Sequence, residues 1–136
     1  MNTTKEKSAV GNGIPATDTK KVSIKSITDN SEKIKCVLQN PGEISELTCI
    51  SNSVNAVSDI VQGTPATITI GIDSMIMIYN RYGYDRVGNK LDANIKLDDG
   101  IIISGTVIIT TFSKHTNDMT IPQVQAVRAW LLKHTI

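Results

Sequence analysis

Residues 97–112, LDDGIIISGTVIITTF, decide the predicted fold. Asp99-Gly100 is typical of a two-residue β-hairpin turn, because both central positions of that turn require positive φ. A strand with one solvated face should alternate apolar and polar residues. The run after Gly100 is instead apolar on both faces, with Ile101, Ile103, Val107 and Ile109 on one side and Ile102, Ile108 and Phe112 on the other. We therefore expect residues 101–112 to form a central strand with other elements packed over both faces.

The stretch before the turn, KLDANIKL at residues 90–97, predicts the hairpin partner. Its alternation places Leu91, Ala93, Ile95 and Leu97 on one face. Counting outward from a two-residue loop pairs Leu97 with Ile102 and Ile95 with Ser104 on the core face. The same register places Ile103 opposite Lys96, on the reverse face.

Two further strand regions precede this hairpin. The alternating stretch TITIGIDSMIMIY, residues 67–79, predicts one long strand, with Gly71 marking a bend or bulge. Its predicted apolar face carries Ile68, Ile70, Ile72, Ile76 and Ile78. Nearer the N-terminus, residues 21–27 and 33–40 alternate and are separated by turn residues, which predicts a first hairpin.

Residues 43–62 leave two alternatives open. Ile44, Leu47, Ile50, Val54, Val57 and Val61 recur at the helical spacing. The stretch is also rich in serine, threonine and asparagine, which compete for backbone hydrogen bonds and disfavour helices. We expect a helix over part of this region, with ELTCIS at residues 46–51 as a short strand in the alternative.

The C-terminal segment predicts an amphipathic helix over residues 121–134. Thr120 is a suitable cap, and Pro122 falls in the first turn, where its missing N–H is not needed. The overall prediction is a β-rich α+β fold: a twisted antiparallel sheet, open or folded into a sandwich or barrel, with this helix packed on it. Residues 21–136 form the single domain, and residues 1–20 form a polar arm.

Composition excludes several classes of protein. The 136 residues carry a formal net charge of +1, so no global field attracts nucleic acid or an anionic membrane. The N-terminus lacks the apolar core of a secretory signal, and no apolar run approaches the ~18 residues of a membrane span. We expect cytoplasmic synthesis, with both cysteines, Cys36 and Cys49, buried as thiols.

No catalytic or metal-binding set is evident in the sequence. His115 and His134 lack Asp, Cys or Glu at metal-ligand spacing, and both are interpreted as surface or hydrogen-bonded histidines. The GIDSM stretch, residues 71–75, lacks the second glycine of a nucleophile elbow, and no phosphate-binding glycine motif occurs. The sequence therefore predicts a non-enzyme without a cofactor or a metal ion.

One cluster of residue types is suited to binding. Three tyrosines and two arginines fall within eight residues: Tyr79, Arg81, Tyr82, Tyr84 and Arg86. Tyrosine and arginine are enriched at interface hot spots, and the same types stack on bases and contact phosphates. The loop is predicted as an interface or ligand site, against the alternative that its tyrosines pack on the sheet edge.

These features lead to an expected function. A single terminal helix cannot cover both faces of the predicted sheet, and the composition of residues 1–20 cannot order them alone. Both features favour a structural subunit of a homo-oligomeric assembly, such as a viral or phage particle, that binds copies of itself and other subunits. The alternative is a single-stranded nucleic-acid-binding module that uses the tyrosine and arginine residues.

Overall fold

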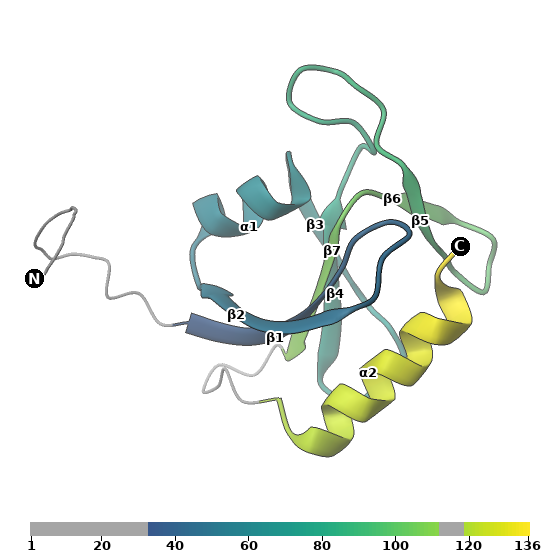
Figure 1. Cartoon of the computed structure of the whole chain (residues 1–136). Coiled ribbons are helices and arrows are strands. Elements are labelled where there is room, and N and C mark those ends of the chain that lie inside the picture. Colours follow the sequence, from purple (N-terminus) through teal and green to yellow (C-terminus); the bar gives the residue numbers. More distant parts are fainter. Residues whose placement is uncertain (1–32, 112–118) are drawn as a thin grey trace, which may run out of the picture. The chain divides into compact units, whose positions relative to one another are not determined.

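The structure, a computed structural model, describes residues 33–111 and 119–136. The elements follow in the order β1 (Lys33–Gln39), β2 (Glu46–Ser51), α1 (Val54–Val61), β3 (Pro65–Thr69), β4 (Met75–Asn80), β5 (Ala93–Lys96), β6 (Ile102–Ser104), β7 (Val107–Thr111) and α2 (Ile121–His134), as Figure 1 shows. The arm predicted at residues 1–20, the strand predicted at residues 21–27, Phe112 and His115 lie outside the described residues.

The main sheet has five strands in the order β2-β1-β7-β4-β3, and every neighbouring pair is antiparallel. β5 and β6 pair separately as a two-stranded sheet. The main sheet is twisted and open, with β2 and β3 at its edges, and it is not a closed barrel. The predicted fold class is therefore confirmed, and β7 lies at the centre as expected.

Both faces of β7 are covered by other parts of the chain. On one face, Val107 and Ile109 pack in a core that includes Val127 and Leu131 of α2. On the other face, Ile108 packs in a second core, against which Val57, Ile60 and Val61 of α1 lie. The expectation that one helix leaves a sheet face for another subunit is therefore wrong, because α1 supplies the second cover.

The predicted continuous strand over residues 101–112 is interrupted at Gly105. This glycine adopts φ +86°, and a Cβ there would lie 2.8 Å from Leu91 Cδ1. The chain bends at this point, so β6 pairs with β5 in the small sheet while β7 enters the main sheet. Only glycine combines this backbone conformation with so close a neighbour.

The hairpin at Asp99-Gly100 forms, but its register differs by one residue from the prediction. The Leu97 N–H donates to the Ile101 carbonyl, which leaves residues 98–100 as a three-residue loop with Gly100 at φ +89°. Ile95 therefore pairs with Ile103 and Lys96 with Ile102. Ile103, predicted on the reverse face, is buried, and Ile102, predicted in the core, is exposed.

Residues 67–79 form a hairpin, so the prediction of one long strand is wrong. β3 pairs antiparallel with β4, and Gly71 and Ser74 in the connection both have positive φ. Ile68 pairs with Met77 across this hairpin. The isoleucines that were predicted to share one face are therefore divided between the two cores. The α2 side holds Ile68, Ile70 and Ile72, and the α1 side holds Ile76 and Ile78.

β1 pairs with β2 and with β7. ELTCIS therefore forms a hairpin with β1, whereas residues 21–27, the predicted partner, lie outside the described residues. The ambiguous stretch 43–62 contains both alternatives, since β2 occupies residues 46–51 and α1 follows it. Ser53 caps α1 by accepting a hydrogen bond from the Ala56 N–H, which explains why the helix begins only there.

α2 has the predicted bounds. The Thr120 side chain accepts from the Gln123 N–H, and the Gln123 side chain accepts from the Thr120 N–H, which completes a capping box. At its C-terminal end, the Ile136 N–H donates to the Asn94 carbonyl and ties the chain to β5. In the part of the chain that the structure describes, neither helix is long and apolar enough to cross a bilayer.

Candidate functional site

Four of the five predicted site residues line one groove: Tyr79, Arg81, Tyr82 and Tyr84. Tyr79 lies in β4, half-buried against the α2-side core. Arg86 does not line this groove. Its guanidinium forms an exposed ion pair with Asp59 of α1, with 2.9 Å between Nη1 and Oδ1. Of the two arginines of the loop, Arg81 therefore lines the groove and Arg86 contacts α1.

Asn80 holds this loop in place, and sequence reasoning missed it. Its side chain is buried, its Nδ2 donates to the carbonyls of Val61 (3.0 Å) and Tyr84 (2.8 Å), and its Oδ1 accepts from the N–H groups of Tyr82 and Gly83. All the hydrogen-bonding capacity of one buried amide is thus used to fix one loop. A single asparagine at a strand end gave no signal of this in the sequence.

The outer part of the loop is ordered by Asp85. Its carboxylate accepts hydrogen bonds from the N–H groups of Asn89 (2.9 Å) and Val87 (3.0 Å), which hold the pKa of Asp85 below its usual value. Tyr84 and Lys90 form an isolated antiparallel bridge below this turn. The loop is therefore a small hairpin that presents its tyrosines in a fixed arrangement.

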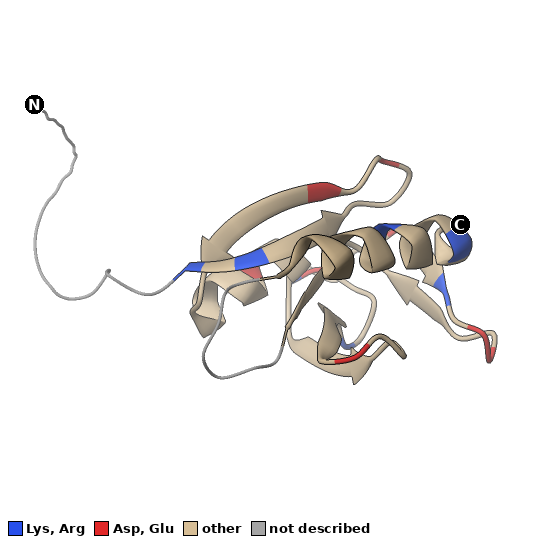
Figure 2. Cartoon of the chain, turned by 90° about the horizontal axis from the view of Figure 1, so that it is seen from below, with Lys and Arg blue, Asp and Glu red and all other residues tan. Residues whose placement is uncertain are grey.

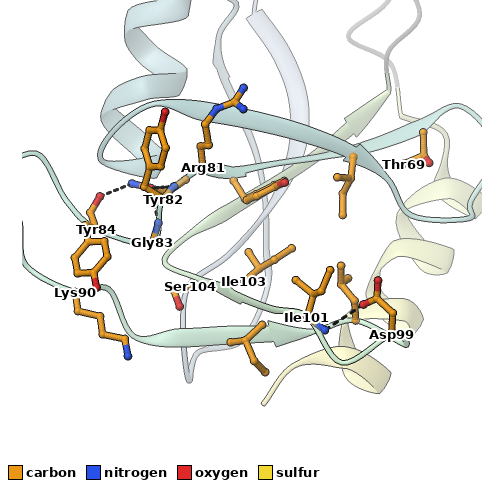
Figure 3. A pocket seen from close by; sticks show the side chains of 15 residues that line it. Thr69, Arg81, Tyr82, Gly83, Tyr84, Lys90, Asp99, Ile101, Ile103 and Ser104 are labelled. Atoms are coloured by element: carbon orange, nitrogen blue, oxygen red, sulfur yellow. Dashed lines mark hydrogen bonds between the residues drawn. The ribbon is translucent and has the colours of Figure 1, made fainter.

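The groove has a volume of about 660 Å³ and lies between β3 and β4 on one side and β6 on the other (Figure 3). Its more buried lining is apolar and includes Ile68, Tyr79, Leu97 and Ile103. Exposed apolar side chains of Tyr82, Tyr84, Ile101 and Ile102 surround its mouth, where Tyr82 is 68% exposed. An apolar floor with aromatic side chains at the mouth is typical of a binding site.

The charged lining residues lie at different ends of the groove. Arg81 and Lys90 lie near Tyr82 and Tyr84 at one end, and Asp99 lies near Ile101 at the other end (Figure 3). Over the whole domain, basic and acidic segments are interspersed (Figure 2). The groove is therefore basic at one end and acidic at the other, which suits a ligand with opposite charges at its two ends.

A second surface, which sequence reasoning missed, lies between α2 and the connection from β1 to β2. It is a groove of about 440 Å³ that includes two very exposed side chains, Ile44 (92%) and Leu132 (85%). Glu43 and Arg128 line the same groove. Leu132 lies about 100° around the helix from the buried Leu131, and this apolar residue off the buried face was the available signal in the sequence. We call the four groove residues Glu43, Ile44, Arg128 and Leu132 the α2 surface.

The remaining candidate side chains have structural roles. His134 is buried, stacks on Trp130, and has its ring nitrogens 2.8 Å from the Trp130 carbonyl and 3.0 Å from Asp98 Oδ1. The prediction of a hydrogen-bonded histidine is confirmed for His134. Within residues 33–111 and 119–136, no group of three or more His, Cys, Asp or Glu could hold a metal ion.

The two cysteines differ, so the prediction that both are buried is wrong. Cys36 is buried in the α1-side core, and burial, together with Cys49 and Glu46, raises the pKa of its thiol to about 12. Cys49 is exposed on the edge strand β2, and neither cysteine forms a disulfide. Side chains alternate between faces along a strand, and this explains why two cysteines in paired strands can differ in exposure.

The chain was compared with protein families, with curated proteins and with solved structures. None of the three comparisons found a match.

Proposed function

We propose that this protein is a non-enzymatic structural subunit of a homo-oligomeric assembly, with a viral or phage particle as the class of assembly. The observation that supports this proposal is the α2 surface, where Ile44 and Leu132 expose most of their side-chain area beside one groove. Clustered apolar exposure rimmed by polar residues is typical of protein–protein contacts. The excess of sheet surface that first suggested assembly is covered by α1, so the proposal rests on α2 instead.

The charges of the α2 surface favour a second copy as the partner. Glu43 and Arg128 lie in the same groove, so a two-fold axis that passes between them brings each Arg128 toward the Glu43 of the other copy. Leu132 and Ile44 line the same groove and then lose contact with water. One surface thus supplies both halves of a symmetric interface.

Light scattering across a concentration series tests this proposal. We expect the wild-type chain to show a mass above that of the monomer. L132E should weaken association by roughly a hundredfold, because it replaces a buried apolar contact with a carboxylate that must lose its water. Val87 is 82% exposed in the tyrosine loop, so V87E is the matched control and should associate normally. A wild-type monomer at every concentration contradicts the proposal.

Charge reversal sharpens the test of symmetry. E43R and R128E should each weaken association, since each places like charges across the proposed axis. The double variant should recover it, because the pair is then restored in the opposite order. Two single variants and a double variant that all associate like the wild type would rule out this interface.

The nucleic-acid alternative rests on the exposed Tyr82 and Tyr84 beside Arg81. Two features weigh against it. Arg86 is already paired with Asp59, and the negative charge of Asp99 in the groove would repel a phosphate. Titration with a labelled single-stranded oligonucleotide separates the two functions. Binding that falls steeply with salt and is lost in Y82A/Y84A would favour the alternative.

A further inference from the structure

We infer that the groove beside the tyrosine loop accepts an extended segment that pairs with the free edge of β3, and that this segment is residues 20–29 of a second copy. The inference deepens the proposed assembly function and rests on it. It assigns a partner to a groove that no residue of the described chain fills.

β3 is an edge strand of the main sheet, and its outer backbone groups are available for pairing. The Arg81 N–H donates to the Thr64 carbonyl (2.8 Å), which fixes the alternation of the antiparallel ladder. Thr64, Ala66 and Ile68 therefore direct their backbone groups toward β4, and Pro65, Thr67 and Thr69 direct theirs outward. Because proline has no N–H, its outward position fits an edge strand and leaves Thr67 and Thr69 as the donors.

The groove determines which side chains an added strand must carry. Ile68 of β3 lines the groove, together with Ile101, Ile102 and Ile103, whereas Thr67 on the opposite face is exposed. Side chains alternate between the faces of a sheet. An added strand therefore needs apolar residues at alternate positions toward the groove and polar residues on the other face, as in other cases of strand addition.

The charges of the groove determine the direction of the added strand. The basic end, with Arg81, is next to the start of β3, because Arg81 pairs with Thr64 just before Pro65. The acidic end, with Asp99, lies toward Thr69 (Figure 3). An antiparallel partner begins at the Thr69 end. It should therefore carry basic residues before its apolar positions and an acidic residue after them.

Residues 20–29, KKVSIKSITD, have this order in the sequence. Lys20 and Lys21 come first, and Asp29 comes last. Val22 and Ile24 share one side of an extended chain, and Lys25 and Ile27 fall on the other side. In the opposite direction, the two lysines would face Arg81 and Lys90. Charge complementarity therefore favours this segment in the antiparallel direction.

Peptide binding to the full chain tests the groove. The receptor is V22D/I24D, whose own segment cannot fill the groove, and the probe is the labelled peptide KKVSIKSITD. A control peptide, DDVSIKSITK, reverses the terminal charges and should bind at least about tenfold more weakly. I102D, at an exposed groove position, should abolish binding of the probe. Equal binding of both peptides, or displacement of the probe by a single-stranded oligonucleotide, would overturn the inference.

Mixing the two variants tests whether the donor is a second copy. V22D/I24D keeps an intact groove, and I102D keeps an intact donor segment. Each variant alone should show a lower mass than the wild type, and their mixture should form one-to-one complexes. If mixing changes no mass, the segment docks within its own chain or not at all, and the second-copy inference is wrong.

The L132E variant separates this inference from the proposed function. Added to V22D/I24D, L132E removes the α2 contact but leaves the groove intact and empty, so V22D/I24D/L132E should bind KKVSIKSITD with the affinity of V22D/I24D. A lower mass for V22D/I24D/L132E than for V22D/I24D, with retained peptide binding, supports both statements. Retained wild-type assembly without any peptide binding supports the α2 contact and overturns the groove inference.

Discussion

The two faces of the main sheet are closed in different ways. On one face, the eight-residue helix α1 lies on Ile78 and Ile108 and completes a small core. On the other face, α2 and the β5–β6 hairpin share the cover, and two grooves remain beside them. The α1 side therefore completes the domain, whereas both candidate binding surfaces lie at the margins of the α2-side cover.

The difference shows that the number of covering elements affects where grooves form. α1 covers its face as a single element, whereas α2 and the β5–β6 hairpin leave one groove at the edge of the sheet and another beside α2. The exposed positions of α2 are apolar at Ile121 and Leu132, whereas α1 exposes Asn55 and Asp59 alongside Val54. Variants on each face can test this contrast.

Truncation of one buried side chain on each face should have the largest effect on stability. I108A removes atoms from the α1-side core and L131A from the α2-side core, and each should lower the free energy of unfolding by about 2–5 kcal/mol. Urea denaturation monitored by circular dichroism measures both. V87A, at an exposed position outside both grooves, is the control and should change it by less than about 0.5 kcal/mol. A loss below about 1 kcal/mol for I108A would show that α1 does not close its face.

Asn80 links the two sides, because it donates to Val61 of α1 and to Tyr84 of the loop. N80A should lower the free energy of unfolding by about 1–3 kcal/mol, since it leaves buried backbone groups without partners. It should also expose residues 81–91 to limited proteolysis. N55A, on the exposed side of α1, is the control. An unchanged proteolysis pattern in N80A would show that the loop is held by other contacts.

The sequence predicted those elements whose signals are local. The bounds of α2 follow from Thr120, Pro122 and Gln123, which act within one turn of the helix. The hairpin at Asp99-Gly100 was predicted for the same reason. Its register was not, because a two-residue and a three-residue loop both place Gly100 at positive φ, and only packing of Ile103 distinguishes them.

Non-local features could not be predicted in this way. The isoleucines of residues 67–79 keep their alternation through the turn, so the sequence pattern does not reveal that the chain reverses direction and divides them between two cores. Of the candidate site, the tyrosine and arginine cluster was predicted from composition. The role of Asn80 depends on Val61, nineteen residues away, and therefore required the structure.

The pH dependence of the free energy of unfolding reports on the burial of the Cys36 thiol on the α1 side. Its pKa is raised to about 12 from 9.0, so above pH 9 the unfolded thiol loses its proton while the folded thiol keeps it. The unfolded state then binds fewer protons, and stability should fall by about 1.4 kcal/mol per pH unit between these two values. Urea denaturation at pH 8 and pH 10 measures the difference. C36A should reduce this slope. C49A should keep most of it, because burial, the largest cause of the raised pKa of Cys36, remains.

The contact between Asp98 and His134 should have the smallest effect. Asp98 is almost fully exposed, and exposed ion pairs contribute about 0–1 kcal/mol. D98N should therefore change the thermal midpoint little, whereas H134A also removes the stack on Trp130 and should lower it more. If D98N destabilised the domain as strongly as H134A, the closure of the α2 side would depend on this carboxylate.

The central position of β7 has a consequence for the order in which the domain folds. β7 pairs with β1, about seventy residues earlier in the chain, so the ladder that joins the two halves of the sheet closes a long loop. Such distant pairing slows folding. During synthesis, the β1–β2 and β3–β4 hairpins emerge from the ribosome well before β7 and must wait with apolar surfaces in contact with water. A nascent chain stalled before Val107 should therefore be an aggregation-prone substrate for chaperones.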